Sequence, residues 1–264
     1  MYNAEAFLAD AVASVLAQTT TVPWELLLVD DGSEDRTLAM ACGFAEAMPT
    51  RVGVLRHASG SNLGTSATRN LGIRHARGKL LAFLDADDVW LPDMLHSQLR
   101  LLRHHPEAAM VYANAERTWD MSLPFLPETG PQGYNSLPPV LPPGARHGLL
   151  PPPLALEWFL TDETLAPCTC TVLVRTDVAR AAGCFEESFD GLYDDQVFYA
   201  KIMLAHPVAV STKCVARYRR HRGSCCVQSW DDAALQLTAR RRFEDWLTGY
   251  RDAFESAQEA LAAD

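Results

Sequence analysis

The sequence predicts an α/β protein built on a doubly wound parallel sheet flanked by helices. Two apolar runs, Trp24–Val29 and Leu80–Leu84, have the length of buried strands, and each passes directly into aspartates. Over residues 1–115 such strands alternate with segments of helical period, an order typical of parallel sheets. Open α/β sheets bind ligands at the carboxyl ends of their strands, so these aspartates mark the expected site.

The expected elements follow in order along the chain. Helices are predicted over residues 4–18, 37–48, 66–76 and 91–104, and strands over 24–29, 51–56, 80–84 and 108–113. Farther on, helices are predicted over 154–161, 176–182 and 196–205, strands over 171–175 and 208–211, and a terminal helical stretch over 230–263, interrupted near Gly249. The chain opens on what resembles the turn after a strand. We therefore expect the sheet to lack its first strand, leaving a gap with unsatisfied backbone groups.

A proline-rich segment at residues 124–153 breaks the alternation, with ten of the sixteen prolines. It predicts a long loop that acts as a lid or binding loop, with a disordered linker as the alternative. The chain thus divides into residues 1–115, residues 116–228 with the proline-rich loop, and a C-terminal helical segment, 229–264.

Composition narrows the function classes. A net charge of −10 argues against a nucleic-acid partner, and no apolar run approaches the roughly 20 residues that span a bilayer. The first residues lack the pattern of a signal peptide, so we expect a cytoplasmic protein, with peripheral contact to the inner face of the membrane as a further option. The seven cysteines are expected to be reduced. Cys168-x-Cys170 and Cys225-Cys226 do not have zinc-site spacing and are interpreted as small buried residues.

The aspartates after Leu84 are the strongest sign of chemistry. Asp85 and Asp87 lie two positions apart and would share one face of an extended backbone. Carboxylates gathered at one point repel each other unless a cation joins them, and hard oxygen ligands suit Mg²⁺ or Mn²⁺ together with a substrate phosphate. The alternative is a solvated acidic turn that caps the following helix.

Four features then coincide in order: Asp30-Asp31 after one strand, a small-residue loop over 62–70 before a helix, Asp85-x-Asp87, and Asp194-Asp195 before a later helix. With these the sequence resembles the family 2 glycosyltransferases of GT-A fold. The matching segments are 2–4, 14–19, 24–33, 62–64, 67–73 and 82–90. The resemblance makes residues 1–115 the nucleotide-sugar-binding half and residues 116–228 the acceptor-binding and catalytic half. The resemblance is dense over 2–115, sparser over 165–222, and absent from the proline-rich loop and terminal helices. It implies a Rossmann-like mixed sheet and a nucleotide-sugar donor, and it makes the absent first strand a central one.

The resemblance also assigns donor-binding roles. Asp30, or its neighbour Asp31, is expected to accept a hydrogen bond from the nucleotide base, and Tyr2 to lie near that base. Asn62 and Arg69 are expected in the donor pocket, with Asp85 near the ribose and phosphate. The alternative for Arg69 is a salt bridge to one of these aspartates.

The metal and catalytic roles come from the same resemblance. Asp87, Asp85 and His221 are expected to hold Mn²⁺ or Mg²⁺, and a neutral imidazole favours Mn²⁺. Arg219 and Arg222 would neutralise the leaving diphosphate, unless the stretch is a basic solvated turn. Asp195 is expected to be the catalytic base, with Asp194 as the other choice because the family usually has Glu-Asp there. A helix N-cap is the structural alternative for this pair.

The leading hypothesis is an inverting, metal-assisted glycosyltransferase that uses a nucleotide-sugar, most simply a UDP-sugar. The alternatives are a degenerate or truncated homologue that binds without turnover, and a nucleotidyltransferase, whose basic glycine-rich first turn is replaced here by residues 2–4. The acceptor is open: a saccharide, a lipid-linked glycan, a protein or a metabolite. Four aromatic residues of the terminal stretch are expected to cover the missing sheet edge, pair two protomers as a homodimer, or contact a membrane: Trp230, Trp246, Tyr250 and Phe254.

Overall fold

The computed structural model describes residues 1–119, 141–145, 148–161, 166–221, 223–224, 229 and 232–263. Its helices are α1 (Leu8–Leu16), α2 (Thr37–Ala47), α3 (Thr65–His75), α4 (Met94–His104), α5 (Leu154–Thr161), η2 (Thr169–Thr171), α6 (Thr176–Ala181), α7 (Asp194–Ala205) and α9 (Ala233–Ala263). Its strands are β1 (Leu26–Asp30), β2 (Val52–Arg56), β3 (Leu80–Ala82), β4 (Val89–Trp90), β5 (Met110–Trp119), β6 (Leu149–Leu150), β7 (Leu173–Arg175) and β8 (Val208–Arg220).

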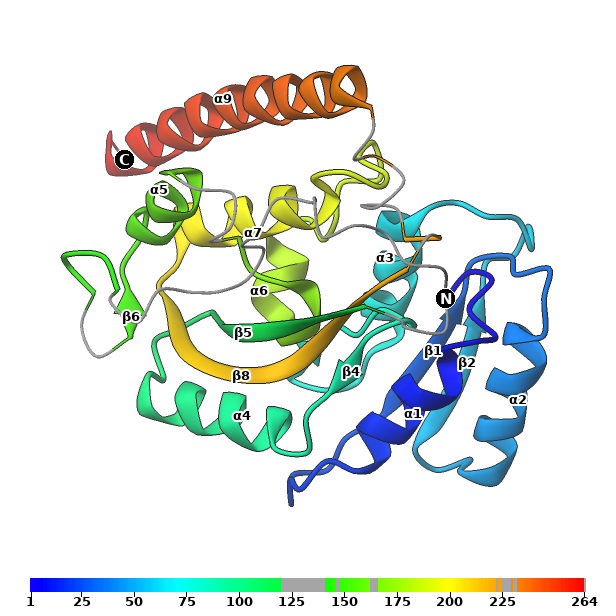
Figure 1. Cartoon of the computed structure of the whole chain (residues 1–264). Helices are drawn as coiled ribbons and strands as arrows, with labels where there is room; N and C mark the ends of the chain where they lie inside the picture. Colours follow the sequence, from blue (N-terminus) through cyan, green and yellow to red (C-terminus); the bar gives the residue numbers. More distant parts are fainter. Residues whose placement is uncertain are drawn as a thin grey trace.

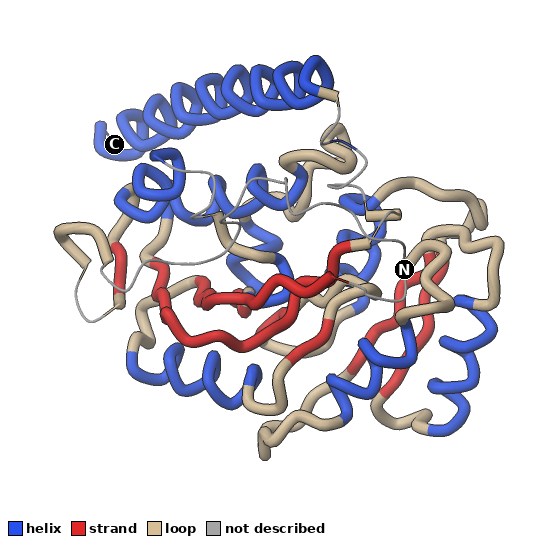
Figure 2. The backbone as a smooth tube through the Cα atoms, in the orientation of Figure 1, coloured by secondary structure: helices blue, strands red, loops and turns tan. Residues whose placement is uncertain are grey.

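The strands form two separate sheets (Figures 1 and 2). β1 and β2 make a parallel pair, and the other strands form a sheet in the order β3-β7-β5-β8-β4, with β6 on β8. β5 and β8 are parallel, whereas β7 runs antiparallel to both β3 and β5. The α/β class is confirmed, and the larger sheet is mixed, as the resemblance implies, rather than purely parallel.

The two sheets leave an open edge between them. Within the described residues, β1 pairs with no strand but β2, and β3 with none but β7. Of the described residues, Met1 is the one that extends the ladder at the free edge of β1: its amino group donates to Val29 O at 2.7 Å, and Asp31 N donates to Met1 O at 2.8 Å. These two bonds are the rung of a parallel ladder opposite Asp30. The gap expected from the sequence is therefore present in the fold.

The apolar cores of the two sheets differ in extent. The larger core lies around β5, β7, β8, α5 and α7, and is centred on fully buried side chains such as Phe159, Phe198 and Met203. The rings of Phe185 and Phe198 stack within it at 4.2 Å. A smaller cluster packs α1 and α2 against the first sheet: Leu8, Val12, Leu28, Ala41 and Val52.

Helix α9 corrects one expectation, because it continues through Gly249 without interruption. Glycine in a helix interior costs only about 1 kcal/mol relative to alanine. Trp246 and Tyr250 stack at 5.0 Å across that position, and with Phe254 they pack against the larger core. This packing outweighs the glycine cost and places α9 along α5 and α7, away from the open edge of β1 (Figure 1). Trp230 lies outside the described residues.

Two further expectations also change. The strand predicted over 208–211 continues to Arg220, because β5 and β4 both pair with its second half. Residues 124–140, 146 and 147 of the predicted proline-rich loop lie outside the described residues, and its end contributes the short strand β6 on β8. None of the helices in the described part of the chain combines the length and apolar character needed to cross a bilayer.

Candidate active site

One cleft of about 1380 Å³ gathers most of the residues that the sequence singles out. The predicted site residues that line it are Tyr2, Asp31, Arg69, Asp85, Asp87, Asp194, Asp195 and His221. Small-molecule pockets usually measure roughly 300–1,000 Å³. This cleft is larger because it runs on between the facing edges of β1 and β3, whose residues also line it.

The first group in the cleft is the acidic turn between β3 and β4. Asp85 and Asp87 were expected on an extended backbone, but Asp88 N donates to Asp85 O at 3.0 Å and closes a turn around Asp87. The turn arises because strand pairing with β7 ends at Ala82. It aims Asp87 at the end of β8, where His221 Nε2 lies 3.1 Å from Asp87 Oδ2. The His221 ring rests on Phe7, with centroids 4.5 Å apart.

Two of these groups could hold a divalent cation as they stand. Asp87 Oδ2 and His221 Nε2 lie 3.1 Å apart, whereas the carboxylate of Asp85, on the same turn, pairs with Arg69, and the three do not come within 4.8 Å of one another. Their side chains are 28%, 14% and 39% exposed, so that they keep room for substrate oxygens or water. Carboxylate and imidazole donors of this kind suit Mn²⁺ or Mg²⁺.

Arg69 of α3 links two acidic groups of the cleft. Its Nη2 lies 2.9 Å from Asp85 Oδ1, and its Nη1 lies 2.8 Å from Asp194 Oδ2. The guanidinium also sits over the Phe185 ring at 5.2 Å. Burial alone would lower the pKa of Arg69, but the carboxylates of Asp85 and Asp194 raise it above its usual value. The salt-bridge alternative is therefore realised twice, and a fixed positive charge stands at the centre of the site.

Asp195 is the carboxylate best prepared to take a proton. It is the second residue of α7, which begins at Asp194 after Tyr193, a residue in a left-handed conformation at φ 66°. Gln196 N donates to Asp195 Oδ1 at 2.7 Å, and Thr169 Oγ1 donates to Asp195 Oδ2 at 3.2 Å. Burial, and then the charge of Asp194, raise the pKa of Asp195 to about 7. The N-cap is Tyr193, which makes no side-chain hydrogen bond to the helix, so the capping alternative is wrong and both aspartates lie within the first turn.

Asp30 and Asp31, the acidic pair at the end of β1, make different contacts. Asp30 is fully buried, accepts hydrogen bonds from Gly32 N and Ser33 N, and pairs with Arg56 at 3.3 Å. Asp31 lines the cleft and holds the neighbouring loop through Leu63 N at 2.8 Å and Gly64 N at 3.1 Å. Asp30 therefore shapes the turn, and Asp31 is the member of the pair that lines the cleft. Tyr2, half exposed, lies on the same cleft.

Other predicted residues lie outside the cleft lining. Asn62 is exposed and accepts a hydrogen bond from Gly64 N at 3.1 Å. Arg219 pairs with Asp10 of α1 at 3.1 Å. Arg222 lies outside the described residues.

Arg220 and Thr169 are cleft residues that sequence reasoning missed. Arg220 is 5% exposed and follows Tyr218 at the two-residue spacing of strand β8, which places both on the cleft side. The alternating pattern would have identified Arg220 if the strand had been extended past residue 211. Thr169 offered no such signal, because its role depends on a contact with Asp195.

The sequence of this chain is similar to those of known proteins. Residues 1–145 match the sequence model for "Glycosyl transferase family 2". The UDP-Glc:alpha-D-GlcNAc-diphosphoundecaprenol beta-1,3-glucosyltransferase WfgD of Escherichia coli is 33% identical over 115 residues, covering 44% of this chain and 43% of the relative. The putative teichuronic acid biosynthesis glycosyltransferase TuaG of Bacillus subtilis is 37% identical over 101 residues, 38% of each chain. The chain thus spans less than half the length of these relatives.

Solved structures resemble this fold over most of the chain. S. aureus TarS 1–349 in complex with UDP-GlcNAc superposes with a TM-score of 0.63 at 19% identity, over 86% of this chain and 58% of that one. The mannosyltransferase PcManGT of Pyrobaculum calidifontis, in complex with GDP-Man and Mn²⁺, gives a TM-score of 0.58 at 15% identity, over 85% and 56%. The α/β fold is shared with these GT-A proteins.

Proposed function

Because the chain belongs to glycosyl transferase family 2, we propose that it transfers a sugar from a nucleotide-sugar, a UDP-sugar first of all, to an acceptor hydroxyl with inversion. The observation that carries this proposal is the convergence of unlike groups on one cleft. A carboxylate–imidazole pair, a buried guanidinium and a carboxylate with a pKa of about 7 all line it.

The donor would lie between the two halves of the cleft. Tyr2 and Asp31 supply polar and aromatic groups for the base on the side of β1, and the turn of Asp85 and Asp87 faces the diphosphate. Asp85, Asp87 and His221 would hold Mn²⁺ or Mg²⁺, which as a Lewis acid stabilises charge on the diphosphate. Arg69 and Arg220 would add fixed positive charge near the same place. The complexes of TarS with UDP-GlcNAc and of PcManGT with GDP-Man and Mn²⁺ support such a donor.

Asp195 would remove the proton from the acceptor hydroxyl. A base is most effective when its pKa lies near the working pH, and burial beside Asp194 raises the pKa of Asp195 to about 7. Thr169 orients the carboxylate through the 3.2 Å bond to Oδ2. Arg69 holds Asp194 but does not pair with Asp195, so the latter stays available to the acceptor. The transfer rate should therefore rise with pH until Asp195 is ionised.

The acceptor and the location of the protein in the cell are proposed from its relatives rather than from the site. The names of WfgD and TuaG point to glycans, one of them joined to a diphosphate lipid, as acceptors of related enzymes. We therefore rank a glycan acceptor first, and with it a cytoplasmic protein that works at the inner face of the membrane. A homodimer through α9 stays a prediction.

Binding without turnover is the second candidate, and the open edge between β1 and β3 favours it. Calorimetric titration of the purified protein with UDP, GDP and dTDP, each with and without Mn²⁺, tests the donor site. We expect one nucleotide to bind in a metal-dependent manner and Asp87→Ala to abolish that binding. Asp252→Ala on the exposed face of α9 is the matched control and should bind normally.

The titration is read together with a donor-hydrolysis assay. Metal-dependent binding with release of free nucleotide from the sugar donor supports a transferase. Binding without release supports the non-catalytic alternative. If folded protein binds none of the three nucleotides, the donor-site assignment is wrong.

A further inference from the structure

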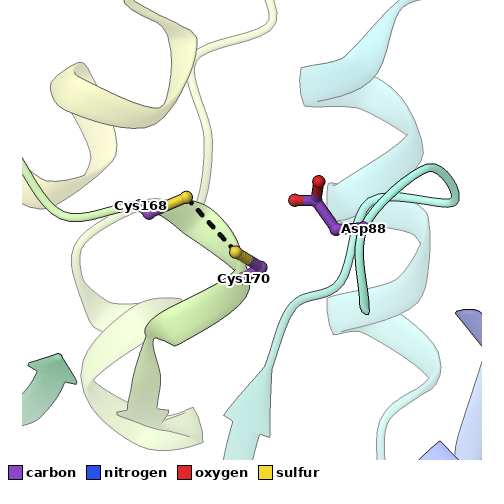
Figure 3. A group of neighbouring side chains, drawn as sticks. All are labelled: Asp88, Cys168 and Cys170. Carbon is purple, nitrogen blue, oxygen red and sulfur yellow. Dashed lines mark hydrogen bonds between the residues drawn. The ribbon is translucent and has the colours of Figure 1, made fainter. Parts of the chain in front are cut away.

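A second group of metal-ligating side chains lies behind the acidic turn. Asp88 of the β3–β4 turn meets Cys168, the residue before η2, and Cys170, which lies within η2 (Figure 3). One ligand atom from each residue lies within 4.8 Å of the others, and the two sulfur atoms are 3.2 Å apart. The three residues are only 1%, 7% and 0% exposed. Because the three side chains are buried, water does not solvate them, and their close approach needs another physical explanation.

The carboxylate of Asp88 supplies an independent reason to look for a ligand. Its Oδ1 accepts a hydrogen bond from Arg219 N at 2.9 Å, but its buried Oδ2 has no hydrogen-bond partner among the residues that the structure describes. Figure 3 shows the carboxylate turned toward the two sulfur atoms. A buried carboxylate oxygen without a partner is costly, and a bound cation removes that cost.

We propose that Asp88, Cys168 and Cys170 form a zinc site, separate from the cation held by Asp87 and His221. Two thiolates and a carboxylate are a donor set that Zn²⁺ accepts and that Mg²⁺ does not. Sulfur atoms 3.2 Å apart can both lie about 2.3 Å from one ion, and a small inward movement of Asp88 completes a three-residue set. Cys168 also lines the cleft, which gives the ion an entry path and leaves room for water as the fourth ligand.

Such an ion would tie together two parts of the proposed active site. Asp88 follows Asp87 directly, so the ion would fix the turn that faces the diphosphate. Thr169 lies between the two cysteines and donates to Asp195, so the same ion would hold the support of the proposed base. The zinc site would therefore position catalytic groups without contacting the substrate itself.

Cobalt substitution tests this site without any assay of activity. Tag-free protein, reduced and freed of metal by a chelator, is titrated with Co²⁺ and followed by absorption. We expect an intense near-ultraviolet thiolate-to-cobalt band that saturates at one equivalent per chain and disappears when Zn²⁺ is added. The band should persist in Asp87→Ala, because oxygen and nitrogen ligands do not produce it.

Variants locate the ligands. Cys168→Ser and Cys170→Ser should each lose most of the band, and Asp88→Asn should weaken the apparent Co²⁺ affinity more than about 10-fold. Cys42→Ser, which changes an exposed cysteine on α2, is the matched control and should leave the titration unchanged.

The wild-type titration decides the question even if a buried cysteine variant does not fold. Absence of the band in protein whose circular dichroism shows a folded chain would overturn the proposal. A band that survives unchanged in folded Cys168→Ser and Cys170→Ser would overturn it equally.

Discussion

The small sheet of β1 and β2 and the large sheet around β5 and β8 differ in the size of their apolar cores and in the site residues that they position. The small sheet lies wholly within the matched segment 1–145 and ends at Asp30-Asp31, but its apolar cluster is small and one edge is open within the described residues. The large sheet holds most of the core; its β3–β4 turn carries Asp85 and Asp87 inside the matched segment, whereas Asp195 on α7 and His221 after β8 lie where the family resemblance is sparse. Recognition from sequence therefore depends on the first half of the chain, which both sheets share, whereas rigidity depends mainly on the large sheet.

The largest expected effect is a loss of transfer rate without a loss of nucleotide affinity. Asp195→Asn should lower the transfer rate roughly 10²–10⁴-fold, because the acceptor hydroxyl loses its base. Nucleotide affinity measured by calorimetry should stay within about twofold, since the donor groups are untouched. Asp177→Asn on α6 is the control. Equal loss of rate and affinity would mean that Asp195 shapes the donor pocket instead.

Truncations in the two cores should differ in stability. Phe198→Ala removes a fully buried ring stacked on Phe185, and we expect a loss of about 3–5 kcal/mol in the free energy of unfolding. Leu28→Ala lies beside the open edge, where neighbours can relax, and should cost about 2 kcal/mol. Urea unfolding followed by tryptophan fluorescence measures both. Similar losses would show that the small sheet is as tightly packed as the large one.

A strand added at the open edge of β1 should reduce the difference in stability between the small sheet and the large sheet. An apolar, β-branched segment of about five residues, the length of β1, can be joined ahead of Met1 to continue its ladder with β1. Burial of its side chains, about 1.5–3 kcal/mol each, exceeds the cost of ordering them, so we expect a net gain on the order of 1–3 kcal/mol. A glycine–serine segment of equal length is the control. Thermal unfolding that does not distinguish the two fusions would argue against strand pairing there.

The smallest effect, counted per pH unit, is a dependence of the free energy of unfolding on pH. The pKa of Asp195 is raised in the folded chain to about 7, above about 3.9 in the unfolded chain, so the folded state binds the extra proton between these values. Its contribution to stability is present below pH 4 and is lost as the pH rises to about 7. Relative to Asp195→Asn, the wild type should lose at most about 1.4 kcal/mol per pH unit in that window. A constant difference between the two unfolding curves would show that the pKa of Asp195 is not raised.

The sequence was informative wherever a local pattern decides the structure. Helix α5 has the predicted bounds, because its apolar spacing and flanking prolines act locally. The second half of β8 was missed because residues 212–220 are largely charged or polar and become a strand only by pairing with β4 and β5. Local signals cannot describe an element whose hydrogen-bond partners lie a hundred residues away.

The candidate site shows the same limit. The identities of Asp85, Asp87 and Asp195 were available from motifs, but the geometry was not. Asp87 meets His221 only because a turn interrupts the backbone that was expected to be extended. Arg69 was expected in the donor pocket, with a salt bridge to one aspartate as the alternative, and it pairs with two, since α7 brings Asp194 to the other side of its guanidinium. Asp88 and Cys170 are likewise neighbours only in the folded chain.

The single rung at Met1 also bears on how copies of this chain behave in solution. A strand edge with free N–H and C=O groups is a template for strands of other molecules. The edge of β1 beyond Met1 is apolar and lies between two sheets, so an intruding strand would gain both hydrogen bonds and burial. Self-association should therefore grow with protein concentration and begin at β1. Mutations that place lysine on that edge would then improve colloidal behaviour without touching the carboxylates of the cleft.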